Sequence, residues 1–216
     1  MPFKSPFGSL AGITPTTLQA ITKTEELAET IEAYEWDNLP VPKEHTRSIT
    51  QLSNQLQEFQ PADDMELNFY PGLDARRIIN NNLEVAWYLA ACIYFHNRLL
   101  KTFNDDIPIN MGKMLKCLFR AEEIKEWLEP DLMKRDAPVI FPAFLGACNS
   151  SDRDSWFALW SLMQEYEHLN ITGKWMAVKA IWNEMDKEKK SWVGVVKVSD
   201  ENPLRLSDFF GGSVFT

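Results

Sequence analysis

The sequence predicts an all-α fold, a single domain of antiparallel helix pairs around a long central helix. Apolar residues recur three and four positions apart over long stretches, which is the period of one helix face. Prolines and clusters of Asn, Asp and Ser separate these stretches, and no segment suggests a β-sheet. A chain of 216 residues fits one large domain or two small ones, and one domain is the simpler interpretation. We therefore expect one domain over residues 1–216, with its core at 7–192 and a C-terminal tail at 193–216.

Two helices are expected before residue 61. Thr14 can cap the free N–H groups of a helix that begins at Pro15, because proline fits the first helical position. The apolar residues that follow keep helical spacing until Pro40 and Pro42 end the segment. A second amphipathic stripe stops at Pro61, and its apolar residues are Ile49, Leu52, Leu56 and Phe59. The acidic, turn-rich stretch 61–72 then predicts a loop.

The longest helix is expected at 75–103, with Asp74 as its N-cap. At 1.5 Å per residue such a helix would be roughly 40 Å long. Its middle is apolar on almost all sides, through Ala86, Trp87, Leu89, Ala90, Ile93, Tyr94 and Phe95. This helix should therefore lie at the centre of the domain. A loop at 104–108 closes it.

The next segment predicts a helix at 109–128, which Glu129 and Pro130 end. One of its faces is apolar, and four charged residues are expected in solvent: Glu122, Glu123, Lys125 and Glu126. The block 139–148 is apolar throughout and is therefore expected to be buried. Its periodicity fits a helix as well as a strand.

Two further helices complete the expected core. Residues 149–152 supply capping side chains for a helix that carries Trp156, Leu159, Trp160 and Met163. Thr172 opens the last helix, whose stripe is Trp175, Val178, Ile181, Trp182 and Met185. A short extended piece is expected at 193–198, and the tail around Gly211 and Gly212 is expected to fray.

Composition and charge narrow the function classes. The 22 basic and 31 acidic residues give a formal net charge of −9, which disfavours non-specific binding to nucleic acid or to an anionic membrane. No run approaches the roughly 18 apolar residues of a membrane span, and the N-terminus does not read as a secretory signal. Three scattered cysteines indicate neither a disulfide framework nor a metal knuckle. We expect an intracellular protein without a metal or a cofactor.

No catalytic motif stands out. Phosphate-binding loops, dinucleotide fingerprints, zinc-protease and serine-hydrolase motifs do not occur. The paired acids at 63–64 and 105–106 invite comparison with the aspartate-rich magnesium sites of terpene cyclases, but their spacing does not place carboxylates one helical turn apart. We interpret them as solvated loop acids.

A few single residues are candidates for function. His96 is the one histidine inside an apolar helix, and a core histidine is the plainer interpretation beside proton transfer or ligand binding. Arg98 is expected to pair with an acid at a helix junction, and Cys148 to be a buried thiol rather than a nucleophile. The chain also has eight tryptophans, most of them expected in the core. Tryptophan-lined space in a helical bundle can enclose an apolar ligand, so an apolar small-molecule pocket is a further hypothesis.

Several blocks of the sequence resemble, in order, the fungal-specific transcription factor domain. This is the regulatory region that follows the zinc binuclear cluster in many fungal regulators. The similarity spans about 7–192, and its most specific part is an apolar block in which Phe141 stands where the family usually has tryptophan. The matching positions are 7–14 (FGSLAGIT), 21–22, 26–28 (ELA), 141–148 (FPAFLGAC), Arg153, Ala177, Val178, Ile181, Trp182 and Asp186.

The resemblance implies an all-helical domain that controls the activity of a regulator through effectors, intramolecular contacts or partner proteins. Such a domain works in the nucleus or the cytoplasm. DNA is read by the zinc cluster, which needs six closely spaced cysteines on two metal ions. The three distant cysteines of this chain cannot form it, so we expect no direct contact with nucleic acid.

Two hypotheses from different classes follow. The chain is a regulatory domain that binds an apolar effector, a protein partner or a second copy of itself. Alternatively it is a free-standing enzyme of secondary metabolism, of a cyclase or rearrangement type, with an aromatic apolar pocket. In that case His96 and Tyr94 are the candidate catalytic residues, and Trp87, Tyr94 and His96 are the candidate ligand-binding residues. A third hypothesis is that the chain is a purely structural interaction protein.

Overall fold

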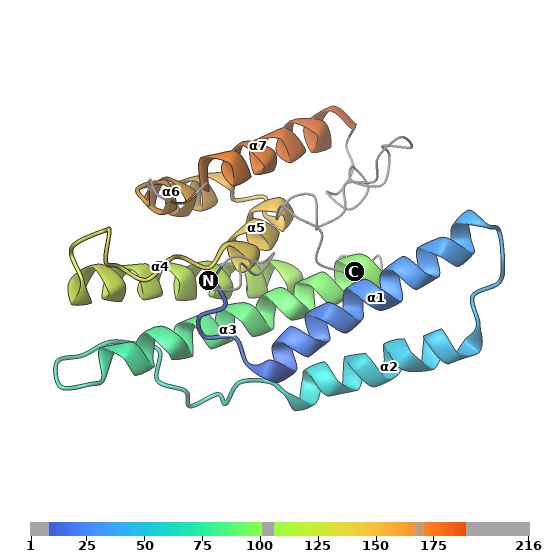
Figure 1. Cartoon of the computed structure of the whole chain (residues 1–216), viewed down its shortest axis with the longest axis horizontal. Helices are drawn as coiled ribbons and strands as arrows, with labels where there is room; N and C mark the ends of the chain where they lie inside the picture. Colours follow the sequence, from blue (N-terminus) through green and yellow to red (C-terminus); the bar gives the residue numbers. More distant parts are fainter. Residues whose placement is uncertain (1–8, 101–105, 167–168, 170, 189–216) are drawn as a thin grey trace.

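The computed structural model describes residues 9–100, 106–166, 169 and 171–188, and this part of the chain is all-α (Figure 1). It contains no sheet, as the sequence predicts. The helices are α1 (Pro15–Trp36), α2 (Lys43–Glu58), α3 (Ala75–Phe95), α4 (Asp106–Leu128), α5 (Ile140–Asn149), α6 (Arg153–Gln164) and α7 (Ile171–Glu188), and a π-helical turn, η1, covers His96–Leu100. None of these helices is long and apolar enough to cross a membrane.

The antiparallel pair α3 and α4 runs through the middle of the molecule (Figure 1). The α1–α2 hairpin lies on one side of this pair, and α6 and α7 lie on the other, with the short α5 between. Most side chains of α3 are buried, which confirms the prediction of a central helix. The division into a core and a tail remains a prediction, because residues 189–216 lie outside the described part. The extended piece at 193–198 and the tail glycines lie there too.

Local capping chemistry places the helix starts as expected. The Thr14 hydroxyl accepts a hydrogen bond from the N–H of Thr17 at 3.2 Å, and Asp74 accepts from the N–H groups of Arg76 and Arg77. Asp152 caps α6 in the same way, through Ser155. These side chains satisfy N–H groups that have no partner inside the helix. The last helix begins at Ile171, one residue before the predicted position.

The end of the central helix differs from the prediction. We expected one helix at 75–103, but α3 ends at Phe95 and continues as the π-helical turn η1. The N–H of His96 is shared between the carbonyls of Cys92 and Ile93, as is common at the end of an α-helix. Residues 101–105 lie outside the described part. A π-helical turn leaves no signature in apolar spacing, so the pattern did not show it.

The start of α4 is also earlier than predicted. We expected a loop at 104–108, but Asp106, Ile107 and Pro108 already belong to the helix. Pro108 is tolerated there because the first N–H groups of a helix have no partner within it. Ile107 is fully buried. The predicted end at Leu128 is confirmed.

The apolar block 139–148 forms a helix, α5, rather than a strand. All its residues from Ile140 to Cys148 are buried. Gly146 faces α6, where the indole of Trp156 lies directly against its Cα. The small residues at this end of α5 therefore let two helices approach closely.

Candidate functional site

Trp87 and Tyr94 lie on α3, and both pack against Phe141 of α5. The ring centroids of Trp87 and Phe141 are 5.7 Å apart, and those of Tyr94 and Phe141 are 5.5 Å apart. The indole N–H of Trp87 donates to the carbonyl of Ala11 at 3.1 Å, and both side chains are fully buried. The two candidates are thus brought together as part of the core, and their binding of a ligand stays a prediction.

The third candidate, His96, is half-buried at the first position of η1. Its ring lies edge-on to that of Phe95, with centroids 5.7 Å apart. Because it follows Tyr94 by two positions, it does not share a helix face with that residue. A catalytic role for His96 and Tyr94 stays a prediction.

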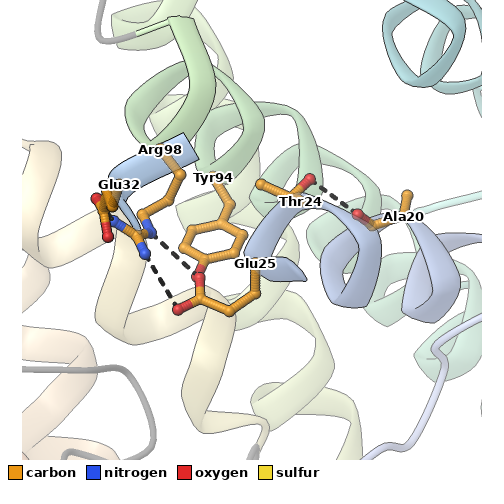
Figure 2. A network of polar contacts seen from close by, with 6 residues as sticks. All are labelled: Ala20, Thr24, Glu25, Glu32, Tyr94 and Arg98. Carbon is orange, nitrogen blue, oxygen red and sulfur yellow. Dashed lines mark hydrogen bonds and ion pairs between the residues drawn. The ribbon is translucent and has the colours of Figure 1, made fainter. Parts of the chain in front are cut away.

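A network of charges joins Tyr94 to α1 (Figure 2). The guanidinium of Arg98 donates from Nε and Nη2 to the two carboxylate oxygens of Glu25, both at 3.1 Å, and from Nη1 to Glu32 at 2.8 Å. The hydroxyl of Tyr94 donates to the same Glu25 carboxylate. Behind Glu25, Thr24 donates to the carbonyl of Ala20 at 2.8 Å (Figure 2). The expectation that Arg98 pairs with an acid at a helix junction is confirmed.

This network fastens the π-helical turn to α1. Burial, and next the charge of Glu25, raise the pKa of Tyr94 well above its ordinary value, so its hydroxyl remains a donor. The neighbouring Asn97 donates to the side chain of Asn149 at 2.9 Å, which ties the same turn to α5. A bidentate arginine in a mostly buried position holds its partners in one geometry. The arrangement is suited to positioning helices, and its residues already satisfy one another.

Replacing Arg98 by methionine is expected to lower the free energy of unfolding by about 2 kcal/mol, because Glu25 would lose its counter-charge beside the core. Urea unfolding followed by circular dichroism measures the change. Lys134, whose ion pair with Asp131 is exposed, supplies the control, and Lys134→Met is expected to stay within about 0.5 kcal/mol of the wild type. Equal effects of the two substitutions would contradict a stabilising role for the network.

A second network corrects the prediction for α4. Glu122 and Lys125 were expected in solvent, but their exposed fractions are 4% and 3%. The ammonium of Lys125 donates to Glu122 at 2.7 Å and to the carbonyl of Ala137 at 3.2 Å, and the hydroxyl of Tyr166 donates to Glu122 at 2.6 Å. The segment after α4 and the end of α6 cover these charges. Helical spacing places Glu122 and Lys125 on the polar face of α4, so it cannot reveal that other segments of the chain cover that face.

The remaining candidates for chemistry are also placed by the structure. Asp63 and Asp64 are exposed in the loop before α3, as expected, and no group of three or more His, Cys, Asp and Glu in the described part of the chain could hold a metal ion. Burial raises the pKa of the Cys148 thiol, so it remains protonated and is a poor nucleophile. Asp105 lies outside the described residues.

A cleft opens on the face of α3 that points away from the two aromatic candidates. It lies between the loop after α2, the middle of α3 and the first turns of α4, and its volume is about 450 Å³. This is within the range of small-molecule sites. Its described lining is mixed: the apolar side chains include Met65, Leu67, Val85, Leu89 and Ile109, and the polar ones include Gln60, Asp63, Tyr88, Cys92, Asn110 and Lys113.

Neutral polar groups, the cation Lys113 and the acid Asp63 complete the described lining of the cleft. Tyr88 and Cys92 lie one helical turn apart on α3, and burial raises the pKa of both, that of Cys92 to about 11. Both groups are therefore uncharged at neutral pH. Lys113 and Ile109 stand at the rim on α4, and Ile109 is 71% exposed. Sequence reasoning missed these residues, because a loop far from α4 in sequence forms one wall.

A patch of aromatic residues, two of them exposed and one half-buried, lies at the other end of α4. We call it the Trp127 patch, made of Phe69, Tyr70 and Trp127, and it surrounds a hollow of about 400 Å³. The ring centroids of Phe69 and Trp127 are 4.8 Å apart, and Trp127 is 65% exposed. Of the eight tryptophans, five are buried as expected, Trp36 and Trp127 are exposed, and Trp192 lies outside the described residues.

Comparison with known families gives one match. The model of the fungal specific transcription factor domain matches residues 3–204. No curated protein and no solved structure matches the chain.

Proposed function

The chain belongs to the family of the fungal specific transcription factor domain, and from this premise we propose that it is a regulatory domain that responds to a small effector. The match over 3–204 carries the proposal, because it covers nearly the whole chain and confirms the resemblance drawn from the sequence blocks. The regulatory role comes from the family. Binding of an effector is the finer step, and we expect it to take place in the nucleus or the cytoplasm.

The cleft beside Tyr88 supports an effector rather than a catalytic role. It is large enough for a small molecule, and its floor offers uncharged groups. A general acid or base needs a pKa near the working pH, and a nucleophilic thiol needs a lowered one. The raised pKa values of Tyr88 and Cys92 suit binding instead. The sequence given holds three cysteines, too few to form a zinc binuclear cluster within it.

The Trp127 patch favours a protein partner as a second candidate function. Tryptophan, tyrosine and arginine are enriched among the residues that dominate protein interfaces, and Arg120 lies beside Tyr70 and Trp127 around the same hollow. Large exposed aromatic side chains gathered at one place are unusual on a surface without a partner. Effector and partner are compatible, since a regulatory domain needs both an input and an output.

A reporter experiment tests the proposed function. Residues 1–216 are inserted between a foreign DNA-binding domain and an activation domain in a fungal host, with an inert helical domain of similar size as the control. We expect the reporter output to differ from the control and to change with the nutrients supplied, by a factor in the range of about 5 to 150 that is typical of coupling between sites. Output equal to that of the inert domain under all conditions would contradict a regulatory role.

A further inference from the structure

The charge around the cleft is uneven, although the protein as a whole is acidic. Lys113, Lys116 and Arg120 are spaced by three and four positions on α4, so they share one helix face that leads away from the cleft. Burial raises the pKa of the Cys117 thiol. The charges of Arg120 and Lys113 act in the opposite direction, so both cations lie near this thiol. This face of α4 therefore carries three cations beside the cleft, whose lining also contains the acid Asp63.

The lining sorts into an apolar floor and a polar rim. Val85 and Leu89 are buried, Met65 and Leu67 are half-buried, and these four side chains form the floor with the uncharged pair of Tyr88 and Cys92. At the rim, Lys113 is the only cation among the described residues of the lining, and the amide of Asn110 stands one turn before it on α4. Within the described part of the chain Lys113 forms no ion pair, not even with Asp63 across the rim.

These features select one class of ligand. A phosphate site would need several converging donors or cations, and the lining offers one ammonium. A purely apolar ligand would leave the Lys113 and Asn110 donors unused at the mouth. An apolar body with a single acidic group uses both parts of the cleft, since flexible methionine and leucine side chains adapt to varied apolar shapes.

We propose that the cleft binds a small amphipathic organic acid, whose apolar part lies among Met65, Val85 and Leu89 and whose carboxylate is held at the rim by Lys113. The inference deepens the proposed function, because it names the class of effector and the site that takes it. Asp63 stands on the opposite wall, so the carboxylate points toward α4 and away from the loop.

The binding test uses the purified full chain and the fluorescent probe anilinonaphthalene sulfonate, an aromatic acid. We expect saturable binding of the probe and its displacement by decanoate. Ala62 lines the cleft from the exposed loop, so Ala62→Trp is expected to fill it and to weaken probe binding by at least about tenfold. Asp64 is also exposed and is not among the described residues of the cleft lining, and Asp64→Trp is the matched control. Circular dichroism establishes that each variant is folded.

A second pair of variants tests the charge. Lys113→Gln is expected to weaken the binding of decanoate by about fivefold, which is the range of an exposed ion pair. Displacement of the probe by decanol, which has no carboxylate, is expected to be unchanged. Lys116→Gln on the same helix, outside the lining, is expected to change neither. The variant Trp127→Ala tests whether the probe binds at the Trp127 patch instead of the cleft. We expect its probe affinity to equal that of the wild type.

The outcomes are decisive for the site. Probe affinity that is unchanged in both Ala62→Trp and Lys113→Gln, or lost in Trp127→Ala, would overturn the proposal. If Lys113→Gln weakened the binding of decanoate and of decanol equally, the role of the carboxylate would be overturned. The reporter experiment is independent of these binding measurements. If the probe binds but the reporter output does not change, the regulatory role is refuted and the binding site stands. If the reporter output is regulated but the probe does not bind in the cleft, this site is refuted and the regulatory role stands.

Discussion

Gly146→Ala is expected to lower the free energy of unfolding by about 3 kcal/mol, the upper end of what overpacking usually costs. A Cβ added at this position of α5 would lie 2.0 Å from Cη2 of Trp156 and 2.3 Å from Cζ2. The indole is buried at 1% exposure and is held by the surrounding core, so it cannot move aside as an exposed side chain could. Helices α5 and α6 would have to separate.

A second glycine gives a matched control for this prediction. Gly112 lies in the exposed part of α4, and a Cβ there would meet no atom within 4 Å. Gly112→Ala is therefore expected to stabilise the protein by roughly 0.5–1 kcal/mol, because alanine loses less backbone freedom on folding. Urea unfolding of both variants checks the pair. If Trp156→Leu in the Gly146→Ala background fails to restore part of the loss, the clash is not the cause.

Local chemistry explains which parts of the fold could be predicted. The caps at Thr14, Asp74 and Asp152 act within three residues, and the apolar stripes of α1, α3 and α7 report which face is buried. Both kinds of signal are present in a short window of sequence. The block at 139–148 lacked a polar face, so its helical state is decided by its packing against α3, α6 and α7 and not by its own pattern.

The missed features depend on segments that are distant in sequence. The π-helical turn is held by two of its own residues, since Arg98 pairs with Glu25 of α1 and Asn97 bonds to Asn149 of α5, and both partners lie more than fifty positions away. The cleft needs the loop after α2 to lie against α4, and no periodicity encodes that meeting. Trp87 and Tyr94 could be found as central aromatic residues because their helix is apolar on all sides. Tyr88 and Lys113 could not, since a half-buried and an exposed residue look the same in the sequence at a cleft as at a plain surface.

Lys125→Met is expected to lower the free energy of unfolding by about 3–5 kcal/mol, the range for breaking a buried ion pair. The methionine keeps the apolar stem of the lysine and removes the charge. Glu122 would then keep the Tyr166 hydroxyl but lose its counter-charge inside the core, and the carbonyl of Ala137 would lose a donor. Lys116→Met, on the exposed face of the same helix, is expected to stay within about 0.5 kcal/mol of the wild type.

A double variant separates the charge from the packing. Glu122→Gln together with Lys125→Met removes both charges and keeps a carbonyl oxygen that accepts the Tyr166 hydroxyl. Because an intact buried ion pair contributes little net stability against uncharged groups of similar shape, the double variant should be more stable than Lys125→Met alone. Urea unfolding of the four proteins gives the coupling energy. A double variant whose loss equals the sum of the two single losses would mean that Glu122 and Lys125 stabilise the fold independently, through packing and hydrogen bonds rather than through their mutual charge.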